Sequence, residues 1–448
     1  MAASNHDTVA AIATAPGRAG IGVVRVSGRA LGKFILSICG KNLCARAATL
    51  CDFSDGTGGL IDRGLALFFP APHSYTGEDV LELQGHGGPV VLQRLLKRCL
   101  TLGARVAEPG EFSKRAYLNG KMDLAQAEGV ADLIDASTEQ AARCANRSIQ
   151  GEFSAEINAL GQQLLELRAL TEATLDFPEE EIDVGTRGDQ QRRLQGIQSR
   201  LAQLLRASDQ GSLLREGALV VLAGRPNAGK SSLLNRLAGE EVAIVTEIPG
   251  TTRDAIRQSI NLFGVAVHIV DTAGLRESSD PVERIGIART WETIAKADLA
   301  VLVIDATLGE SVEDRAILAK LPDGMSRLRV YNKADLAGKE AGWSREGDRG
   351  TVTLSAKTGE GIETLRSALA EAIGWRGEAE GGFMARARHL EALRAAQAGL
   401  ARADKEAQRQ ELLAEELRGA HEALMSITGE VTSDDLLGEI FSRFCIGK

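Results

Sequence analysis

The 448-residue sequence predicts a multidomain protein that combines mixed α/β and all-α parts. The chain is longer than one hydrophobic core usually serves. Its first third reads as mixed α/β, helical periodicity begins near residue 125, and strand-like runs alternate with helices from about 219 to 373 before helical periodicity returns. The economical arrangement is an α/β domain inserted between two halves of one helical domain. The predicted ranges are 1–119 for the N-terminal domain, 120–215 and 376–448 for the two helical parts, and 216–375 for the inserted domain.

The composition is that of a globular protein, with 44% hydrophobic and 25% charged residues. The formal net charge of −9 disfavours a general nucleic-acid binder, which needs a basic face to displace counterions, although a local basic patch stays open. The N-terminus lacks a secretory signal, and there is no run of about eighteen apolar residues. We therefore expect a cytoplasmic protein that does not enter a membrane.

The first third contains short β-branched runs broken by proline and glycine, such as TVAAIATAP at 8–16 and IGVVRVSG at 21–28. A helical stretch, VVLQRLLKRCLTLG, comes later. The cluster GHGG at 85–88 stands just before it and could bind an anion. Because it lacks the fingerprint of a strand–loop–helix anion site, we interpret it as a plain turn.

The helical parts are predicted from apolar residues that recur at steps of three and four, so that each helix buries one face. The residues of these stripes are Ile157, Leu160, Leu164 and Leu167; Leu194, Ile197, Leu201 and Leu204; and Leu413, Leu417, Ala420, Leu424 and Ile427. The acidic segment FPEEEID at 177–183 separates the first two helices at Pro178. We interpret that segment as a solvated loop.

The inserted domain opens with LVVLAGRPNAGKSSLLNRL, in which Gly-x4-Gly-Lys-Ser occupies 224–231. The pattern follows an apolar strand and precedes an amphipathic helix, which is the context of a phosphate-binding P-loop. Backbone N–H groups at the helix start would surround phosphate oxygens. Lys230 would add charge near the β- and γ-phosphates, and Ser231 would offer an oxygen to Mg²⁺.

Three further motifs follow at predicted strand ends: DTAG from Asp271, NKAD from Asn332 and SAK from Ser355. The carboxylate of Asp335 can accept both the N1–H and the exocyclic amine of guanine, a pair that adenine does not present. Four motifs in this order predict a GTPase. The nucleotide contacts predicted from them are Asn227, Ala228, Gly229, Lys230, Ser231, Ser232, Asp271, Thr272, Ala273, Gly274, Asn332, Lys333, Asp335, Ser355, Ala356 and Lys357.

One position departs from Ras-type GTPases. Leu275 follows DTAG where those enzymes use a glutamine to orient the attacking water, and leucine cannot hydrogen-bond to water. The next segment offers Glu277, Asp280 and Glu283 as substitutes, and spacing alone does not choose among them. No arginine finger is identifiable by inspection.

These motifs and both termini resemble the bacterial tRNA-modification GTPase family known as MnmE or TrmE, over essentially the whole chain. The matching segments are APGRAGIGVVRVSG, SYTGEDVLELQGHGG, NGKMDLAQAEG, GRPNAGKSSLLN, TEIPGTTRD, DTAGLR, NKAD and the terminal FCIGK. The resemblance implies an N-terminal tetrahydrofolate-binding α/β domain that forms a homodimer, a discontinuous helical domain, and an inserted Ras-like P-loop GTPase domain.

The resemblance also implies ligands. Arg25, Glu82 and Lys121, with Lys448 from the C-terminus, match a site for 5-formyl- or 5,10-methylene-tetrahydrofolate. Asn227 matches the side-chain ligand of a potassium ion, and Glu283 matches the acid that positions water. Further loop contacts to the nucleotide and its ions fall on Thr246, Glu247, Ile248, Pro249, Gly250, Thr251 and Thr252. Of these, Thr246, Ile248 and Thr251 match potassium ligands, and Thr252 joins Ser231 as a magnesium ligand.

Cys445 stands in the terminal motif and has two open interpretations. Phe441 and Phe444 could anchor the preceding helix and bury a packed thiol. Alternatively, the same anchors present the thiol beside the folate, where cations such as Arg443 and Lys448 would favour the thiolate. A prenylation box is excluded, because Gly447 is not aliphatic and Lys448 is not a usual last residue.

The implied activity is a potassium-activated GTPase that works with an FAD-dependent partner, called MnmG or GidA, in a heterotetramer. Together they would add a (carboxymethyl)aminomethyl group to C5 of the wobble uridine of certain tRNAs. Lys230, Glu283 and Cys445 are the residues expected to act catalytically. The alternative is a GTP-timed ribosome-assembly factor without modification activity.

Overall fold

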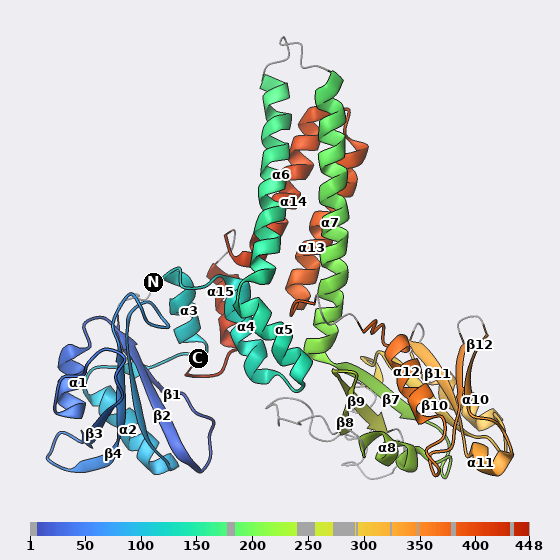
Figure 1. Cartoon of the computed structure of the whole chain (residues 1–448), viewed down its shortest axis with the longest axis horizontal. Helices are drawn as coiled ribbons and strands as arrows, with labels where there is room; N and C mark the ends of the chain where they lie inside the picture. The colour runs from blue at the N-terminus through green and yellow to red at the C-terminus, as the bar shows by residue number, and fades with distance from the viewer. Residues whose placement is uncertain are drawn as a thin grey trace. The chain divides into compact units, whose positions relative to one another are not determined.

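The computed structural model describes residues 7–176, 184–239, 256–271, 292, 294–322, 325–346, 349–377, 382–430 and 434–447. The chain divides into two compact units, Met1–Ala131 with Met425–Lys448, and Asp132–Leu424. Figure 1 shows their elements. The unit boundaries fall inside helices α4 (Leu124–Asp135) and α14 (Gln410–Thr428). The four predicted domain ranges stay a prediction, because this division tests none of them.

The first unit is built on a mixed six-stranded sheet in the order β3-β4-β5-β2-β1-β6. Its strands are β1 (Val9–Ile12), β2 (Ala19–Gly28), β3 (Thr49–Ser54), β4 (Leu60–Phe69), β5 (Asp79–Gly87) and β6 (Arg105–Val106). Only β1 and β6 pair in parallel among the strand pairs described. The helices are α1 (Gly32–Cys39), α2 (Pro89–Thr101), α3 (Glu111–Leu118) and α15 (Asp434–Ser442).

Helix α2 confirms the helical stretch expected after the glycine cluster. Pro89 occupies the first turn, where its missing N–H costs nothing, and Leu92, Leu95 and Cys99 form the face buried on the sheet. The plain turn predicted at 85–88 is wrong. The first three of these residues belong to β5, and Gly88 caps α2.

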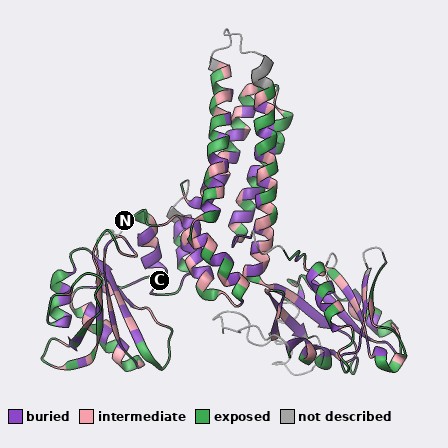
Figure 2. Cartoon of the chain, in the orientation of Figure 1, coloured by how far each residue is buried: buried purple, intermediate pink, exposed green. Residues whose placement is uncertain are grey.

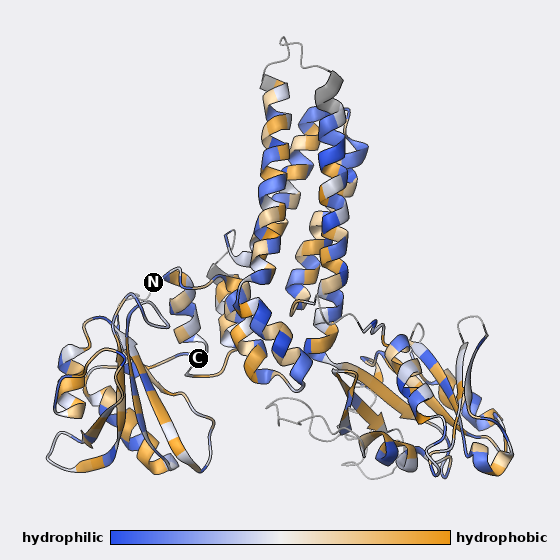
Figure 3. Cartoon of the chain, viewed as in Figure 1, coloured by the Kyte–Doolittle hydropathy of each residue, from blue (hydrophilic) through white to orange (hydrophobic). Residues whose placement is uncertain are grey.

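Every residue of the three predicted apolar stripes is buried (Figure 2). The second unit contains long helices. They are α5 (Glu139–Ile149), α6 (Glu152–Asp176), α7 (Val184–Glu216) and α13 (Ala387–Lys405), together with most of α14. Hydrophobic and hydrophilic residues alternate around these helices in Figure 3, as one-sided burial requires. The predicted loop at 177–183 lies outside the described residues, although α6 and α7 end and begin beside it.

A seven-stranded sheet forms the other part of this unit, in the order β12-β13-β11-β10-β7-β9-β8. Its strands are β7 (Ala218–Ala223), β8 (Ile256–Leu262), β9 (Val265–Asp271), β10 (Leu299–Asp305), β11 (Ser326–Asn332), β12 (Gly342–Glu346) and β13 (Arg349–Thr353). Helices α8 (Lys230–Ala238), α10 (Val312–Ala319), α11 (Ala334–Ala337) and α12 (Ile362–Ala372) alternate with them. The five central strands are parallel and the two edge strands antiparallel.

The parallel strands place the site at one edge of this sheet. Successive strands are laid down on opposite sides of β7, with β9 on one side and β10 on the other. In open α/β sheets, ligands bind outside the carboxyl ends of the strands at such a reversal. Among the described residues, no helix is both long enough and apolar enough to cross a bilayer.

Candidate functional site

The predicted phosphate loop connects the buried strand β7 to α8. Gly224 and Gly229 have φ angles of +143° and +96°, which L side chains rarely adopt. A Cβ on Gly229 would overlap the side-chain amide of Asn332. Asn227 also has a positive φ, +64°, and asparagine tolerates this conformation better than most residues. The loop therefore needs the residue types that the motif supplies.

Lys230 begins α8 and is buried against the loop, with only 7% of its surface exposed. Its ammonium donates to the carbonyl oxygens of Gly224 at 2.8 Å and Arg225 at 3.0 Å. The hydroxyl-bearing Ser231 is exposed at the same helix start. Backbone N–H groups at a helix start, the positive end of the helix dipole and a lysine together favour a phosphate anion.

Asn332 joins the phosphate loop to the two loops predicted to bind guanine. It ends β11 and is 2% exposed. Its amide nitrogen donates to the carbonyl of Ala228 at 2.9 Å, and its amide oxygen accepts from the backbone N–H of Ala356 at 2.9 Å. One side chain thus sets the spacing between the 224–229 loop, the end of β11 and the 355–357 loop.

Lys333 and Asp305 form an ion pair beside this junction, with 2.6 Å between Nζ and Oδ2. Burial works against the charged form of Asp305, but hydrogen bonds from Lys333 and Thr307 outweigh it and hold the pKa of this carboxyl below its ordinary value. Lys333 has a φ of +66°, and Asp335 follows it as an exposed residue on α11. The Asp335 carboxylate is therefore accessible to a ligand.

Several predicted site residues cannot be placed. Asp271 is the last residue of β9, and the structure describes its backbone but not its side chain. The other residues that lie outside the described ranges are Thr246, Glu247, Ile248, Pro249, Gly250, Thr251, Thr252, Thr272, Ala273, Gly274, Glu283 and Lys448. Their roles stay predictions.

A contact that the sequence reading missed supports the phosphate loop from α10. Asp314 is fully buried, and its Oδ2 accepts from the backbone N–H of Ser311 at 3.0 Å and from the Ser311 hydroxyl at 2.8 Å. The Arg225 guanidinium lies 3.4 Å from the same oxygen. The Ser-x-x-Asp spacing at 311–314 was a readable signal of the helix cap, but its ion pair with the loop was not.

A second candidate site lies in the first unit, where Arg25 and Glu82 are directly paired across β2 and β5. The Arg25 guanidinium donates to Glu82 Oε1 from Nε at 3.0 Å and from a terminal nitrogen at 2.9 Å. Its other terminal nitrogen donates to the carbonyl oxygen of Gly447 at 3.3 Å. The structure thus brings together two predicted folate residues and the end of the chain.

Two aromatic rings that the sequence reading did not select complete this cluster. The Arg25 guanidinium lies 5.6 Å from the ring centroid of Tyr75 and 5.8 Å from that of Phe112. Burial raises the pKa of the Tyr75 phenol, whose oxygen is 2.8 Å from the Ser113 hydroxyl. Tyr75 belongs to the SYTGEDVLELQGHGG segment, so its motif, though not its contact, was visible in the sequence.

Lys121, the third predicted folate residue, lies beside Gly77, two residues after Tyr75. Its side chain packs against Gly77, where a Cβ would lie 3.3 Å from Lys121 Cγ. The structure gives no hydrogen bond from Lys121 to the Arg25–Glu82 pair among the described contacts. Lys121 is therefore near the segment that carries Tyr75, but it is not part of the pair.

Residues 434–447, the terminal segment, are held within the first unit by buried phenylalanines. Phe441 and Phe444 are 2% and 5% exposed and share a cluster with Leu124 and other α4 residues. The backbone N–H of Gly110 donates to the carbonyl of Cys445 at 3.3 Å. Anchoring by the phenylalanines is as expected, but the interpretation of Cys445 as a packed thiol is wrong, because this residue is exposed.

A buried network of charges holds α3, the helix against which the terminal segment lies. Arg115 is 6% exposed and pairs with Asp7, Glu78 and Glu111, at 2.8, 2.9 and 2.8 Å respectively. Glu111 also pairs with Arg105 at 2.6 Å. Removing one member of such a network leaves a buried charge without its partner, which is strongly destabilising. Glu111 and Arg115 have the i,i+4 spacing of a helix pair, but Asp7 and Glu78 are distant from Arg115 in sequence, so spacing gave no signal of these two partners.

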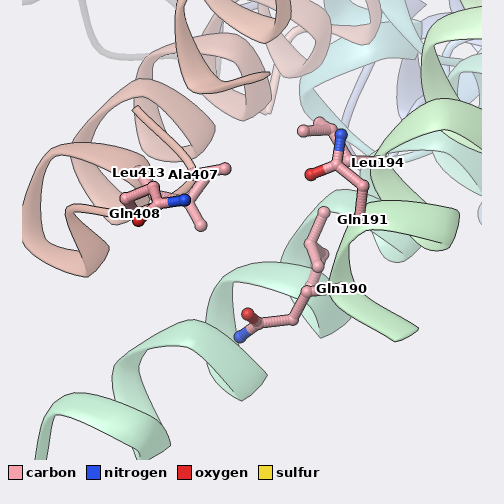
Figure 4. A pocket seen from close by; sticks show the side chains of 7 residues that line it. Gln190, Gln191, Leu194, Ala407, Gln408 and Leu413 are labelled. Carbon is pink, nitrogen blue, oxygen red and sulfur yellow. The ribbon is translucent and has the colours of Figure 1, made fainter. Parts of the chain in front are cut away.

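One cavity lies apart from both candidate sites, at the α13–α14 connection (Figure 4). It measures about 150 Å³ and is lined by Leu167, Gln190, Gln191, Leu194, Ala407, Gln408 and Leu413. None of these side chains is titratable or nucleophilic. The cavity can hold a small polar group or water, but it offers no chemistry.

The phosphate loop, Asn332 and the 355–357 loop meet at the carboxyl edge of one parallel sheet, which defines a P-loop nucleotide-binding domain. Family comparison matches residues 8–121 to "GTP-binding protein TrmE N-terminus" and residues 124–445 to "MnmE helical domain". The tRNA modification GTPase MnmE of Nitrosomonas eutropha is 58% identical over 449 residues, covering 99% of this chain and all of that one. The chain belongs to the MnmE family.

Another relative of the same name, from Acidovorax sp., is 56% identical over 466 residues and matches the whole of both chains. Solved structures match smaller parts. The G domain of the T. maritima FeoB iron transporter is 26% identical, covers 35% of this chain and 98% of its own, and gives a TM-score of 0.26. Aquifex aeolicus Era is 24% identical, covers 41% of this chain and 66% of its own, and gives a TM-score of 0.28. Scores this low support no inference.

Proposed function

We propose that this chain is a GTP hydrolase that acts in tRNA modification. The observation that carries the proposal is the phosphate site at the start of α8, which Asn332 connects to the guanine-side loop. Membership of the MnmE family over the full chain supplies the tRNA context. The proposed substrate places the protein in the cytoplasm.

The phosphate site suits GTP with Mg²⁺. Lys230 contributes a charge at the phosphates, and the exposed Ser231 hydroxyl contributes an oxygen to the metal. Asp271, at the carboxyl end of β9, would be the acidic group that contacts the metal through its water shell. Asp335 recognises guanine. Bound Mg²⁺ would neutralise the charge that develops on the phosphates during transfer.

The proposal extends to potassium as the activating cation. Asn227 offers a side-chain oxygen to the cation. It belongs to the phosphate loop, where its backbone has a positive φ. Thr246, Ile248 and Thr251 would complete the ligand set, and Thr252 would bind Mg²⁺. Glu283 would orient the attacking water in place of the glutamine that Leu275 replaces.

The Arg25 cluster fits a reduced folate. Glu82 is 19% exposed and accepts hydrogen bonds, so it can receive the donors of a pterin edge. Tyr75 provides a half-buried aromatic ring beside Arg25, whereas the ring of Phe112 is fully buried. Lys121 with Lys448 would attract an anionic glutamate tail. A bound tetrahydrofolate would supply the one-carbon unit. Cys445 is exposed two residues before Gly447, and its thiol would hold or move a proton beside the folate.

In this proposal the chain forms a homodimer through its N-terminal domain and a heterotetramer with an FAD-dependent partner of the MnmG type. The assembly adds a (carboxymethyl)aminomethyl group to C5 of the wobble uridine of certain tRNAs, with glycine or ammonia as the nitrogen source. The α8 site and the folate site use separate sets of residues. In this proposal GTP hydrolysis controls the modification rather than supplying its chemistry.

Mass spectrometry of tRNA nucleosides tests the proposal. A strain that lacks this protein should lose the modified wobble uridine, and the wild-type gene should restore it. Lys230→Ala, which removes the phosphate-site ammonium, should fail to restore it. An unchanged nucleoside profile in the deletion strain, together with altered ribosome assembly, would support the alternative assembly factor instead.

A further inference from the structure

Helix α8 carries functional groups at both of its ends. It begins with Lys230 at the phosphate loop and has Arg236 in its last turn. The Arg236 guanidinium donates to two successive backbone carbonyls, from Nε to Ala356 at 3.3 Å and from a terminal nitrogen to Lys357 at 2.7 Å. Both carbonyls belong to the loop that follows β13.

That loop is a tight turn held from two sides. Within it, the Ser355 N–H donates to the Glu360 carbonyl and the Gly359 N–H to the Ser355 carbonyl, both at 2.9 Å. Asn332 holds the N–H of Ala356 from the β11 side. Arg236 holds the carbonyls from the α8 side, so the turn cannot move relative to α8 without breaking charge-assisted hydrogen bonds.

Arg236 contacts the loop where the loop borders a cavity, although Ala356 itself belongs to the buried core. A cavity of about 360 Å³ lies against Ser232, Asn235, Arg236, Gly239 and Ala356. A Cβ placed on Gly359 would lie 3.7 Å from the guanidinium carbon, which is an ordinary van der Waals distance, so Arg236 does not pack tightly against Gly359. A planar guanidinium can bind two carbonyls in fixed geometry, whereas an ammonium is a single point charge.

We propose that Arg236 is a positioning residue for guanine recognition. It keeps the 355–357 loop at a fixed distance from the phosphate-binding start of α8, so that base and phosphates are bound together. This inference rests on the proposed GTP-binding function. Asn332 already connects the two halves of the site, and the proposal gives a residue outside the four nucleotide motifs a second, independent part in fixing their spacing.

The test compares three variants of the full-length protein. Arg236→Met keeps an unbranched side chain but removes both hydrogen bonds, so the Kd for GDP and the KM for GTP should rise about tenfold. The kcat should stay unchanged, because Lys230 and Ser231 are untouched. Arg236→Lys should give an intermediate Kd. Arg327→Met is the matched control, since it removes one guanidinium–carbonyl bond, to Pro322 at 3.3 Å, at the opposite end of β11.

Competition by inorganic tripolyphosphate separates positioning from general damage, because this probe has no base. Its affinity should be the same in the wild type and in Arg236→Met. Wild-type GDP affinity in Arg236→Met, or equal losses for GDP and tripolyphosphate, would overturn the role of Arg236. Absence of GDP binding by the wild-type protein would instead overturn the proposed function.

Discussion

Gly110 lies between α3 and the terminal segment, and its replacement by alanine should detach that segment. Gly110 has a φ of +66°, and a Cβ there would lie 2.6 Å from the Phe441 carbonyl oxygen and 2.8 Å from Phe444 Cβ. Gly120 has nearly the same φ, +65°, but a Cβ there would meet nothing within 4 Å. Gly120→Ala is therefore a matched control for the cost of placing alanine at a positive φ.

The two substitutions share one cost and differ in another. A left-handed conformation costs an L residue about 1–2 kcal/mol, and both variants bear this. Only Gly110→Ala adds overlap with a packed neighbour, which costs about 1–3 kcal/mol. Undocking of the terminal segment relieves that overlap, so the opening equilibrium of the segment should rise about 5- to 150-fold over the control.

Limited proteolysis with trypsin measures this opening. Arg443 is the cleavage point within the terminal segment, and cleavage follows the open population when reclosing is fast. Gly110→Ala should be cut at Arg443 about 5- to 150-fold faster than Gly120→Ala. Equal cleavage of the two variants would refute the reasoning, because it would show that contact at Gly110 does not hold the segment.

Other predictions concern both sites. Potassium, but not sodium, should accelerate GTP hydrolysis, and Asn227→Ala should remove this selectivity with nucleotide binding nearly intact; equal wild-type rates in the two salts would exclude a potassium site. Glu283→Ala should lower kcat with little change in GTP affinity, as single-turnover kinetics can check; a parallel loss of binding would mark a structural role. Burial opposes ionisation of Glu111, but hydrogen bonds from arginines outweigh it and lower its pKa below 4.5. Its stabilisation is therefore complete above that pH and is lost as pH falls through the lowered pKa, and Glu111→Gln should flatten acid unfolding followed by circular dichroism; an identical acid profile would contradict this. Cys445→Ser should abolish tRNA modification while GTP turnover and folate binding persist, whereas full retention of modification would reduce the thiol to a bystander.

The helices and the phosphate loop could be predicted because their signals are local. The stripe from Ile157 to Leu167 repeats at the period of an α-helix, and every member is buried. The loop before Lys230 is one continuous motif between a strand and a helix. In each case neighbouring residues contain the whole pattern, so no knowledge of the tertiary structure was needed.

The glycine cluster at 85–88 was misread because a tertiary contact, rather than a local turn, requires glycine there. A Cβ on Gly87 would lie 2.6 Å from the Ala19 carbonyl oxygen, so glycine here serves close approach of β5 to β2 rather than a turn. Arg236, Tyr75 and Phe112 were missed for a similar reason. Their partners are distant in the chain, and one sequence does not show which arginine or aromatic ring meets which loop.

The docking of the terminal segment also determines when the Arg25 cluster is completed during synthesis. Arg25 and Gly447 are separated by 422 positions, yet they share a hydrogen bond. Domains generally fold as units, N-terminal first, as they leave the ribosome. The sheet that carries Arg25 can thus form early, but the cluster of contacts around this side chain stays incomplete until Gly447 has been translated. A chain truncated before Gly447 could still form much of this sheet, but it would lack the hydrogen bond that joins Arg25 to the terminal segment.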